Sequence, residues 1–149
     1  MALWFECKVR YDKMTENGQV KKVNEEPYLV DALTFTEAEA RIIEEMTPFI
    51  SGEYSLASEK KTKISEVFFK EGGDRWYLVK VNFITLDEKT GVEKKTTSQI
   101  LVQASDFDSA VSNFKEGMQG TMADYEIGSV AETLIMDVYP ANLGAKTAE

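Results

Sequence analysis

The feature that most constrains this chain is an internal repeat, because the segment Trp76–Phe83 follows the pattern of the segment Trp4–Tyr11. Later matches keep almost the same offset, and the single-residue slips fall in loops between the predicted elements. Similarity that respects element boundaries is typical of a duplicated unit. The pattern therefore predicts two copies of one unit, residues 1–73 and 74–141. At an offset of 72 residues, Trp4, Lys8 and Val9 match Trp76, Lys80 and Val81.

Each copy begins with a predicted pair of strands. Residues 3–11 alternate apolar and polar side chains, which is typical of a half-buried strand. The Asn17-Gly18 pair favours a hairpin turn, because both residues tolerate a positive φ. The chain is expected to return as a strand that runs to Leu33, with Pro27 interrupting its pairing or marking a bulge.

A helix is predicted to follow the strand pair. Thr36 is the expected N-cap, with Glu39 completing a capping box, and Asp108 takes the place of Thr36 in the second copy. Pro48 should end the first helix near Met46 or Thr47. One face of this helix carries apolar residues at helical spacing, namely Ala38, Ile42 and Met46.

One long extended segment closes each copy. These segments are residues 54–69 in the first copy and residues 125–139 in the second, where Pro140 ends the strand. Residues 142–149 are expected to form a flexible tail. We predict a single compact domain, residues 1–141, built of the two repeats.

The predicted fold class is α+β. It consists of two tandem strand–strand–helix–strand repeats with pseudo-two-fold symmetry, forming a mostly antiparallel sheet with two helices packed on it. One helix cannot cover both faces of a three-stranded sheet, so the copies are expected to share a core. Two arrangements are compatible with this, a single continuous sheet or two sheets facing each other.

The composition indicates a globular protein of the cytoplasm. Hydrophobic residues make up 43% of the chain, and no apolar run is long enough to span a membrane. Cys7 is the only cysteine, so an internal disulfide is excluded, as expected in a reducing compartment. We expect Cys7 to be a buried, unreactive residue on a strand.

The same composition argues against catalysis. The chain has no histidine, the commonest general base and transition-metal ligand. Glu44 and Glu116 occupy equivalent positions, as do Glu66 and Asp137, but neither pair belongs to a loop with supporting ligands. We interpret these carboxylates as surface charge and expect no enzyme, no catalytic residue, no cofactor and no metal.

A candidate binding face lies on the outward side of the first strand in each copy. It comprises Trp4, Lys8 and Arg10 in the first copy and Trp76 and Lys80 in the second. Aromatic residues among cations on an open sheet are a common platform for single-stranded nucleic acid. The net charge of −9 opposes binding to phosphates, and the alternative is that both tryptophans belong to the core or to a subunit interface.

Several phrases of the chain resemble an uncharacterised family found in Bacteroidetes bacteria and their phages, a domain of unknown function. The phrases are residues 26–41, Gly-Asp-Arg-Trp-Tyr (73–77), Gly-Thr-Met-Ala-Asp-Tyr-Glu-Ile (120–127) and Glu-Thr-Leu-Ile-Met-Asp-Val-Tyr (132–139). The resemblance implies a cytosolic bacterial or phage setting. It implies no activity and no catalytic or binding residues.

Three functions are compatible with these observations. The first is a small non-enzymatic interaction module that binds a protein partner or forms a homodimer, which the acidity, the apolar strand Trp76–Phe83 and the missing catalytic residues favour. The alternative is a nucleic-acid-binding accessory protein that uses the aromatic and basic face. A second alternative is a small-molecule binder or enzyme with its site in the seam between the repeats.

Overall fold

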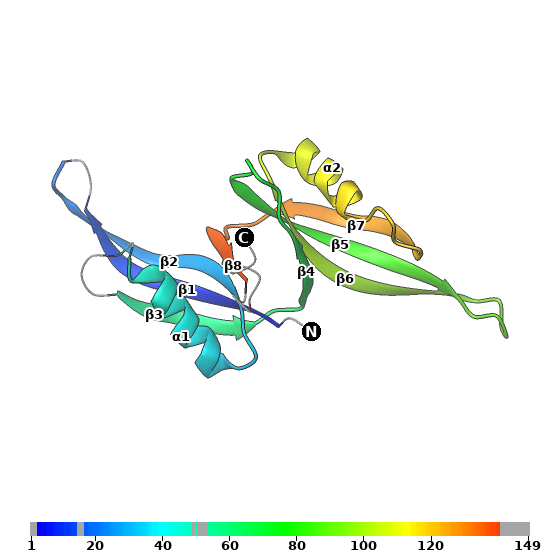
Figure 1. Ribbon diagram of the computed structural model, residues 1–149, viewed down its shortest axis with the longest axis horizontal. Helices are drawn as coiled ribbons and strands as arrows, with labels where there is room; N and C mark the ends of the chain where they lie inside the picture. The colour runs from blue at the N-terminus through cyan, green and yellow to red at the C-terminus, as the bar shows by residue number, and fades with distance from the viewer. Residues whose placement is uncertain (1–2, 15–16, 49, 51–53, 141–149) are drawn as a thin grey trace, which may run out of the picture. The chain divides into compact units, whose positions relative to one another are not determined.

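The computed structural model in Figure 1 describes residues 3–14, 17–48, 50 and 54–140, with residues 13, 14 and 21–25 described by their backbone alone. Internal contacts divide the chain into two compact units. The first unit comprises Met1–Thr62 together with the segment from Leu134 onward, and the second comprises Lys63–Thr133.

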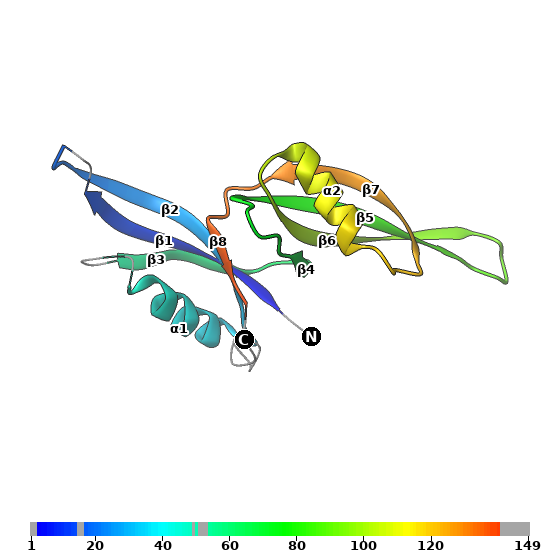
Figure 2. The ribbon, with the colours of Figure 1, turned by 45° about the horizontal axis from the view of Figure 1, so that its top comes forward.

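The first unit is a four-stranded sheet with one helix. Its sheet has the order β3-β1-β2-β8, in which β1 pairs antiparallel with β2 and β3, and β2 pairs parallel with β8. The helix α1 contacts β1, β2 and β3 and covers one face of the sheet (Figure 2). The elements are β1 (Trp4–Met14), β2 (Val20–Asp31), α1 (Phe35–Met46), β3 (Tyr54–Lys61) and β8 (Asp137–Tyr139).

The second unit has a sheet of corresponding order. The order is β4-β6-β5-β7, in which β5 pairs antiparallel with β6 and β7, and β4 pairs parallel with β6. The helix α2 packs on this sheet, mainly against β6 and β7. The elements are β4 (Ile64–Phe68), β5 (Arg75–Leu86), β6 (Glu93–Ala104), α2 (Phe107–Gly117) and β7 (Asp124–Glu132).

The predicted α+β class is confirmed, with mostly antiparallel pairing and two packed helices. Two separate four-stranded sheets form, so a single continuous sheet is wrong. The pseudo-two-fold symmetry and the single domain of residues 1–141 stay predictions. The units border at Thr62 and Lys63 rather than at the expected repeat border after residue 73, because β4 joins the second sheet. The predicted tail, residues 142–149, lies outside the described residues.

The long extended segment predicted at the end of each copy is wrong, because each forms two strands that pair in different sheets. Residues 54–69 contain β3 and β4, and residues 125–139 contain β7 and β8. A threonine ends the first strand of each pair. The backbone N–H and Oγ1 of Thr62 both bond to the carbonyl of Trp4, at 2.9 and 2.8 Å, and Thr133 does the same to Trp76 at 2.8 and 2.9 Å. The chain leaves the sheet after each threonine.

Both helices begin two residues earlier than predicted. Thr34 is the N-cap of α1, and its side chain accepts a bond from the Glu37 N–H, so the expected cap at Thr36 is wrong. Asp106, not Asp108, caps α2 and accepts from the Ser109 N–H at 2.8 Å. The sheet decides between two suitable caps, because a buried alanine at the end of the preceding strand (Ala32, directly after β2, and Ala104, the last residue of β6) lies two residues before each cap. The predicted C-terminus of the first helix is confirmed, since α1 ends at Met46.

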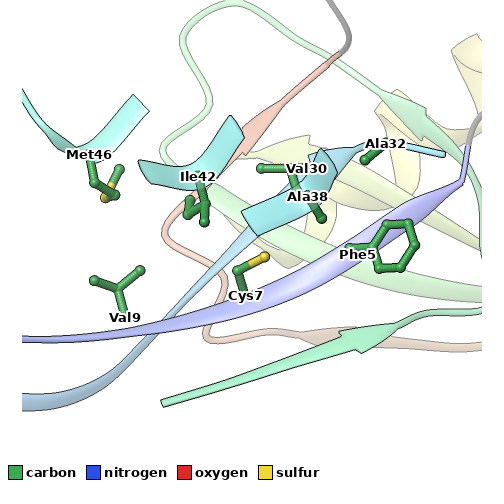
Figure 3. Close-up of a cluster of buried hydrophobic side chains, with 8 residues drawn as sticks. All are labelled: Phe5, Cys7, Val9, Val30, Ala32, Ala38, Ile42 and Met46. Atoms are coloured by element: carbon green, nitrogen blue, oxygen red, sulfur yellow. The ribbon is translucent and has the colours of Figure 1, made fainter. Parts of the chain in front are cut away.

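The core of the first unit lies between α1 and its sheet. Figure 3 shows the side chains of α1 facing those of β1 and β2, and Cys7 lies buried among them as predicted. Burial raises the pKa of the Cys7 thiol to about 12, with smaller contributions from Glu59, Glu6 and Glu39. The thiol is therefore protonated and unreactive at neutral pH. The cluster comprises Phe5, Cys7, Val9, Val30, Ala32, Ala38, Ile42 and Met46.

The core of the second unit is centred on Phe114 of α2, which is fully buried. Its ring lies 6.1 Å from that of Phe68 on β4 and 5.8 Å from that of Tyr125 on β7. This side chain therefore links the helix to both edge strands of its sheet. The buried residues around it are Val79, Val81, Ile100, Val102 and Met118.

Gly117, the last residue of α2, allows β4 to approach the helix. A Cβ at this position would lie 2.5 Å from the ring of Phe68. A change from glycine to alanine within a helix normally stabilises it by about 1 kcal/mol. We expect Gly117→Ala to lower the free energy of unfolding by about 1–3 kcal/mol instead, because the ring is overpacked. Urea unfolding measures the change. The double variant Gly117→Ala, Phe68→Leu should recover part of the lost stability. A Gly117→Ala variant more stable than the wild type would contradict the prediction.

The edge strands β3 and β7 carry a bulge at an equivalent place in the two units. The register between β1 and β3 shifts between Lys8 and Val9, opposite Ala57, and that between β5 and β7 shifts opposite Gly128. Further shifts lie between Val9 and Tyr11 in the pairing of β1 with β2 and between Ile64 and Glu66 in the pairing of β4 with β6. Pro27 itself stays in register opposite Lys8, so the bulge lies beside the predicted position rather than at it. A bulge moves the following residues to the other face of the sheet.

Candidate functional site

The candidate binding face is divided between the two units. Trp4, Lys8 and Arg10 lie on β1, and Trp76 and Lys80 lie on β5. Both indoles are buried, with 5% of Trp4 and 3% of Trp76 exposed, whereas Arg10 and Lys80 are exposed. A buried indole offers no free ring face to a base, so the structure adds no support for nucleic-acid binding here. The binding face itself stays a prediction.

The carboxylates that the sequence places at equivalent positions lie on the surface. Glu66 and Asp137 are exposed, and Glu116 forms an ion pair with Lys70 at 3.1 Å. An exposed ion pair of this kind contributes at most about 1 kcal/mol. In the part of the chain that the structure describes, no group of three or more Cys, Asp or Glu residues could hold a metal ion.

A tyrosine cluster surrounds the carboxylate of Glu26 in the first unit. The hydroxyls of Tyr11 and Tyr28 both donate to Glu26 Oε1, at 3.0 and 2.8 Å. The ring of Tyr28 stacks on that of Tyr139 at 6.1 Å, which attaches β8 to β2 through side chains as well as backbone. Burial raises the pKa of each of these three tyrosines, and Glu26 adds to the increase at Tyr11 and Tyr28.

These tyrosines should make the protein less stable at alkaline pH. Burial and the charges of Asp137 and Glu45 raise the pKa of Tyr139 from 10.0 to about 12. The folded state therefore holds a proton that the unfolded state releases, so the contribution of Tyr139 to the free energy of unfolding is constant below pH 10 and falls as the pH rises towards 12. Tyrosinate absorbance during pH titration, combined with urea unfolding, measures both effects.

Glu26→Gln provides the control for this titration. It removes the charge that raises the pKa of Tyr11 and Tyr28, so both should ionise at lower pH. Tyr139 should be unaffected, because its shift comes from burial and from other carboxylates. Ionisation of all three tyrosines at the ordinary value in the wild-type protein would contradict the prediction.

A groove lies between α1 and the edge strand β3 of the first unit, with a volume of about 470 Å³. The hydroxyl of Tyr54 donates to the carbonyl of Ile43 at 3.1 Å and bonds to Thr47 Oγ1 at 2.9 Å, which holds the ring against α1. The groove therefore combines apolar side chains, a fixed tyrosine and a carboxylate. The lining residues are Glu39, Ile43, Tyr54, Ser55 and Leu56.

Glu59 lies on β3 beyond the groove and faces the helix side of the sheet. It pairs with Cys7, whose side chain belongs to the helix-side core. Its Oε2 is shielded from solvent and has no hydrogen-bond partner among the described residues. Burial, and then the charge of Glu39, raise the pKa of Glu59. Two carboxylates thus lie near each other without a cation bonded to Glu59 Oε2.

Sequence reasoning missed Glu59, because strict alternation from Tyr54 and Leu56 places Glu59 on the opposite face. The bulge at Ala57 reverses that alternation. The tyrosine cluster was also missed, although Tyr11 and Tyr28 lie two residues from Val9 and Val30 and so are expected on the same, inward face of their strands. A sequence signal existed for the tyrosines, whereas none existed for Glu59.

The described residues form no helix that is long and apolar enough to cross a membrane. Comparison with known proteins finds no match among curated proteins and none among solved structures. A family model matches residues 3–141, nearly the whole chain. The chain belongs to the family described as Domain of unknown function (DUF4494).

Proposed function

We propose that this protein is a small non-enzymatic interaction module that binds a protein partner or a second copy of itself. The observation that carries the proposal is a long edge strand in each unit, β3 in the first and β7 in the second, whose outer edge pairs with no other strand among the described residues. These strands have 8 and 9 residues and contain no proline. An edge strand presents backbone donors and acceptors to which an extended segment can add.

The bulges at Ala57 and Gly128 restrict this pairing without preventing it. Each bulge divides its edge strand into two short runs, which discourages uncontrolled edge-to-edge aggregation. Short runs with free backbone groups suit a specific and reversible partner. A cytoplasmic setting in Bacteroidetes bacteria or their phages belongs to this proposal, and enzymatic activity does not.

Substitution of the edge strands tests the proposal. Ser58 and Ser129 are exposed and lie opposite Lys8 and Lys80 on the neighbouring strands. The double variant Ser58→Glu, Ser129→Glu places a carboxylate opposite each lysine, a cross-strand pair that preserves folding. Light scattering of the pure protein measures self-association, and quantitative affinity capture from a bacterial extract compares partners of the wild type and the variant.

The expected result is self-association, or a defined partner, that the wild type retains and the folded double variant loses. Glu88→Gln, an exposed change away from both edges, serves as the control and should behave as the wild type. A wild-type protein that stays monomeric and captures the same proteins as the variant would overturn the proposal.

A further inference from the structure

The groove between α1 and β3 joins a backbone edge to a side-chain pocket. β3 contributes Tyr54, Ser55 and Leu56 to the groove wall, and its other edge is unpaired in the described sheet. A strand added to β3 would direct alternate side chains towards the helix side of the sheet. The groove is therefore placed to receive a side chain of that strand.

The chemistry of the groove favours a long cationic side chain. Ile43 and Leu56 provide apolar contacts for an aliphatic stem, which Lys and Arg bury while their charged ends remain polar. Glu39 lies at the groove and Glu59 close by, with the unpartnered Oε2. A cation at this place would donate a hydrogen bond to Glu59 Oε2, which has no donor among the described residues.

The helix that contributes Glu39 to the groove is itself acidic. α1 carries Glu37, Glu39, Glu44 and Glu45, and it has no basic residue in its last turn. Its single basic residue, Arg41, donates to the backbone carbonyls of Asp31 and Pro140, the latter at 2.8 Å. Arg41 thus connects the helix to β2 and to the end of β8, and the four glutamates of α1 outnumber its one basic residue.

The second unit shows that the fold does not need this carboxylate pair. The equivalent of Glu39, counted from the helix caps at Thr34 and Asp106, is Val111. The equivalent of Glu59 is Val130, which pairs with Val79 as Glu59 pairs with Cys7. In the second unit Val130 packs against the buried core, and Val111 takes the place of Glu39, whereas two carboxylates occupy these positions in the first unit. The first unit thus keeps an electrostatically unfavourable pair that its architecture could replace.

We propose that the groove between α1 and β3 binds an extended basic segment of a partner protein, which adds to the edge of β3 and places a lysine or arginine between Glu39 and Glu59. The inference rests on the proposed interaction function and names the partner's chemistry. The backbone edge supplies affinity, and the carboxylate pair selects the cation. The equivalent region of α2 and β7, with its two valines, does not select a cation.

A labelled peptide tests the inference directly. The probe is a fluorescein-labelled peptide of the length of β3, 8 residues, that alternates lysine and threonine. A peptide with glutamine in place of lysine is the comparison. Fluorescence anisotropy measures affinity at physiological salt, and amide chemical shifts locate the bound peptide, which should perturb Tyr54 to Glu59. The double variant Glu39→Gln, Glu59→Gln should weaken binding roughly tenfold, the effect of losing a charge-assisted contact.

A second double variant separates a specific site from general attraction to an acidic protein. Glu88→Gln, Glu93→Gln removes the same net charge at exposed positions around the hairpin between β5 and β6. It should leave peptide affinity unchanged. Equal weakening by both double variants, or chemical shifts outside β3 and α1, would overturn the inference.

A stability measurement distinguishes a binding role from a structural one. Glu59→Val introduces the residue that the second unit has at the equivalent position. It should therefore raise the melting temperature of the free protein and lower its affinity for the peptide. A lower melting temperature would mean that Glu59 stabilises the fold, against the inference. If partners are captured through the edges but are indifferent to Glu39 and Glu59, this inference fails while the interaction function stands.

Discussion

Phe114→Ala is expected to lower the free energy of unfolding by about 3–5 kcal/mol, the range for removing a buried aromatic ring. Phe114 is fully buried and lies between the rings of Phe68 and Tyr125. Its removal leaves a cavity that α2, β4 and β7 all border, and these elements come from well-separated parts of the chain. The site therefore cannot collapse by moving one segment alone.

Urea unfolding followed by circular dichroism measures this loss. Phe107→Ala is the matched control, because it makes the same chemical change in the same helix at a side chain that is 52% exposed. The control should cost less than about 1 kcal/mol. Similar losses in both variants would show that the Phe114 ring is not the centre of the second unit's core.

Val138→Asp is expected to detach β8 from the first unit. Val138 is 5% exposed and pairs with Leu29 of β2, which is fully buried. An unpaired carboxylate at such a position costs about 3–5 kcal/mol. A strand of three residues cannot offset that cost through its backbone bonds, so the parallel pairing with Tyr28, Leu29 and Val30 should be lost.

Amide hydrogen exchange tests this expectation residue by residue. Exchange should accelerate in the half of β2 that pairs with β8, and the stacked Tyr28 should lose its contact with Tyr139. Met136→Asp is the control, because that side chain is 52% exposed and precedes β8 by one residue. Unchanged exchange in β2 of the Val138 variant would contradict the pairing of β2 with β8.

Local patterns predicted most of the elements correctly. Alternation in residues 3–11 identified β1 and its inward residues Phe5, Cys7 and Val9, all of them buried. The turn at Gly18 has the expected positive φ of 78°. Apolar spacing identified the buried face of α1, because side chains three and four residues apart lie on one side of a helix. These features depend on neighbours close in sequence.

The candidate site was less accessible to such reasoning. The sequence singled out Trp4 and Trp76, which are buried. It assigned Glu39 to a capping box with Thr36 and did not single out Glu59. The face of the sheet on which Glu59 lies depends on the register between β3 and β1. That register is set by packing across the sheet rather than by the residues of one strand.

The sequence by itself determined the α+β class, the helices and the alternation of the strands, since each follows from local periodicity and turn chemistry. The tertiary structure alone decided that β4 pairs with β6 and that β8 returns to β2. A strand's sequence shows which faces are apolar, but its hydrogen-bonding edges are the same in every strand. The choice of neighbour therefore depends on which sheet edge the folded chain leaves open, and the bulge that turns Glu59 towards α1 depends on that pairing too.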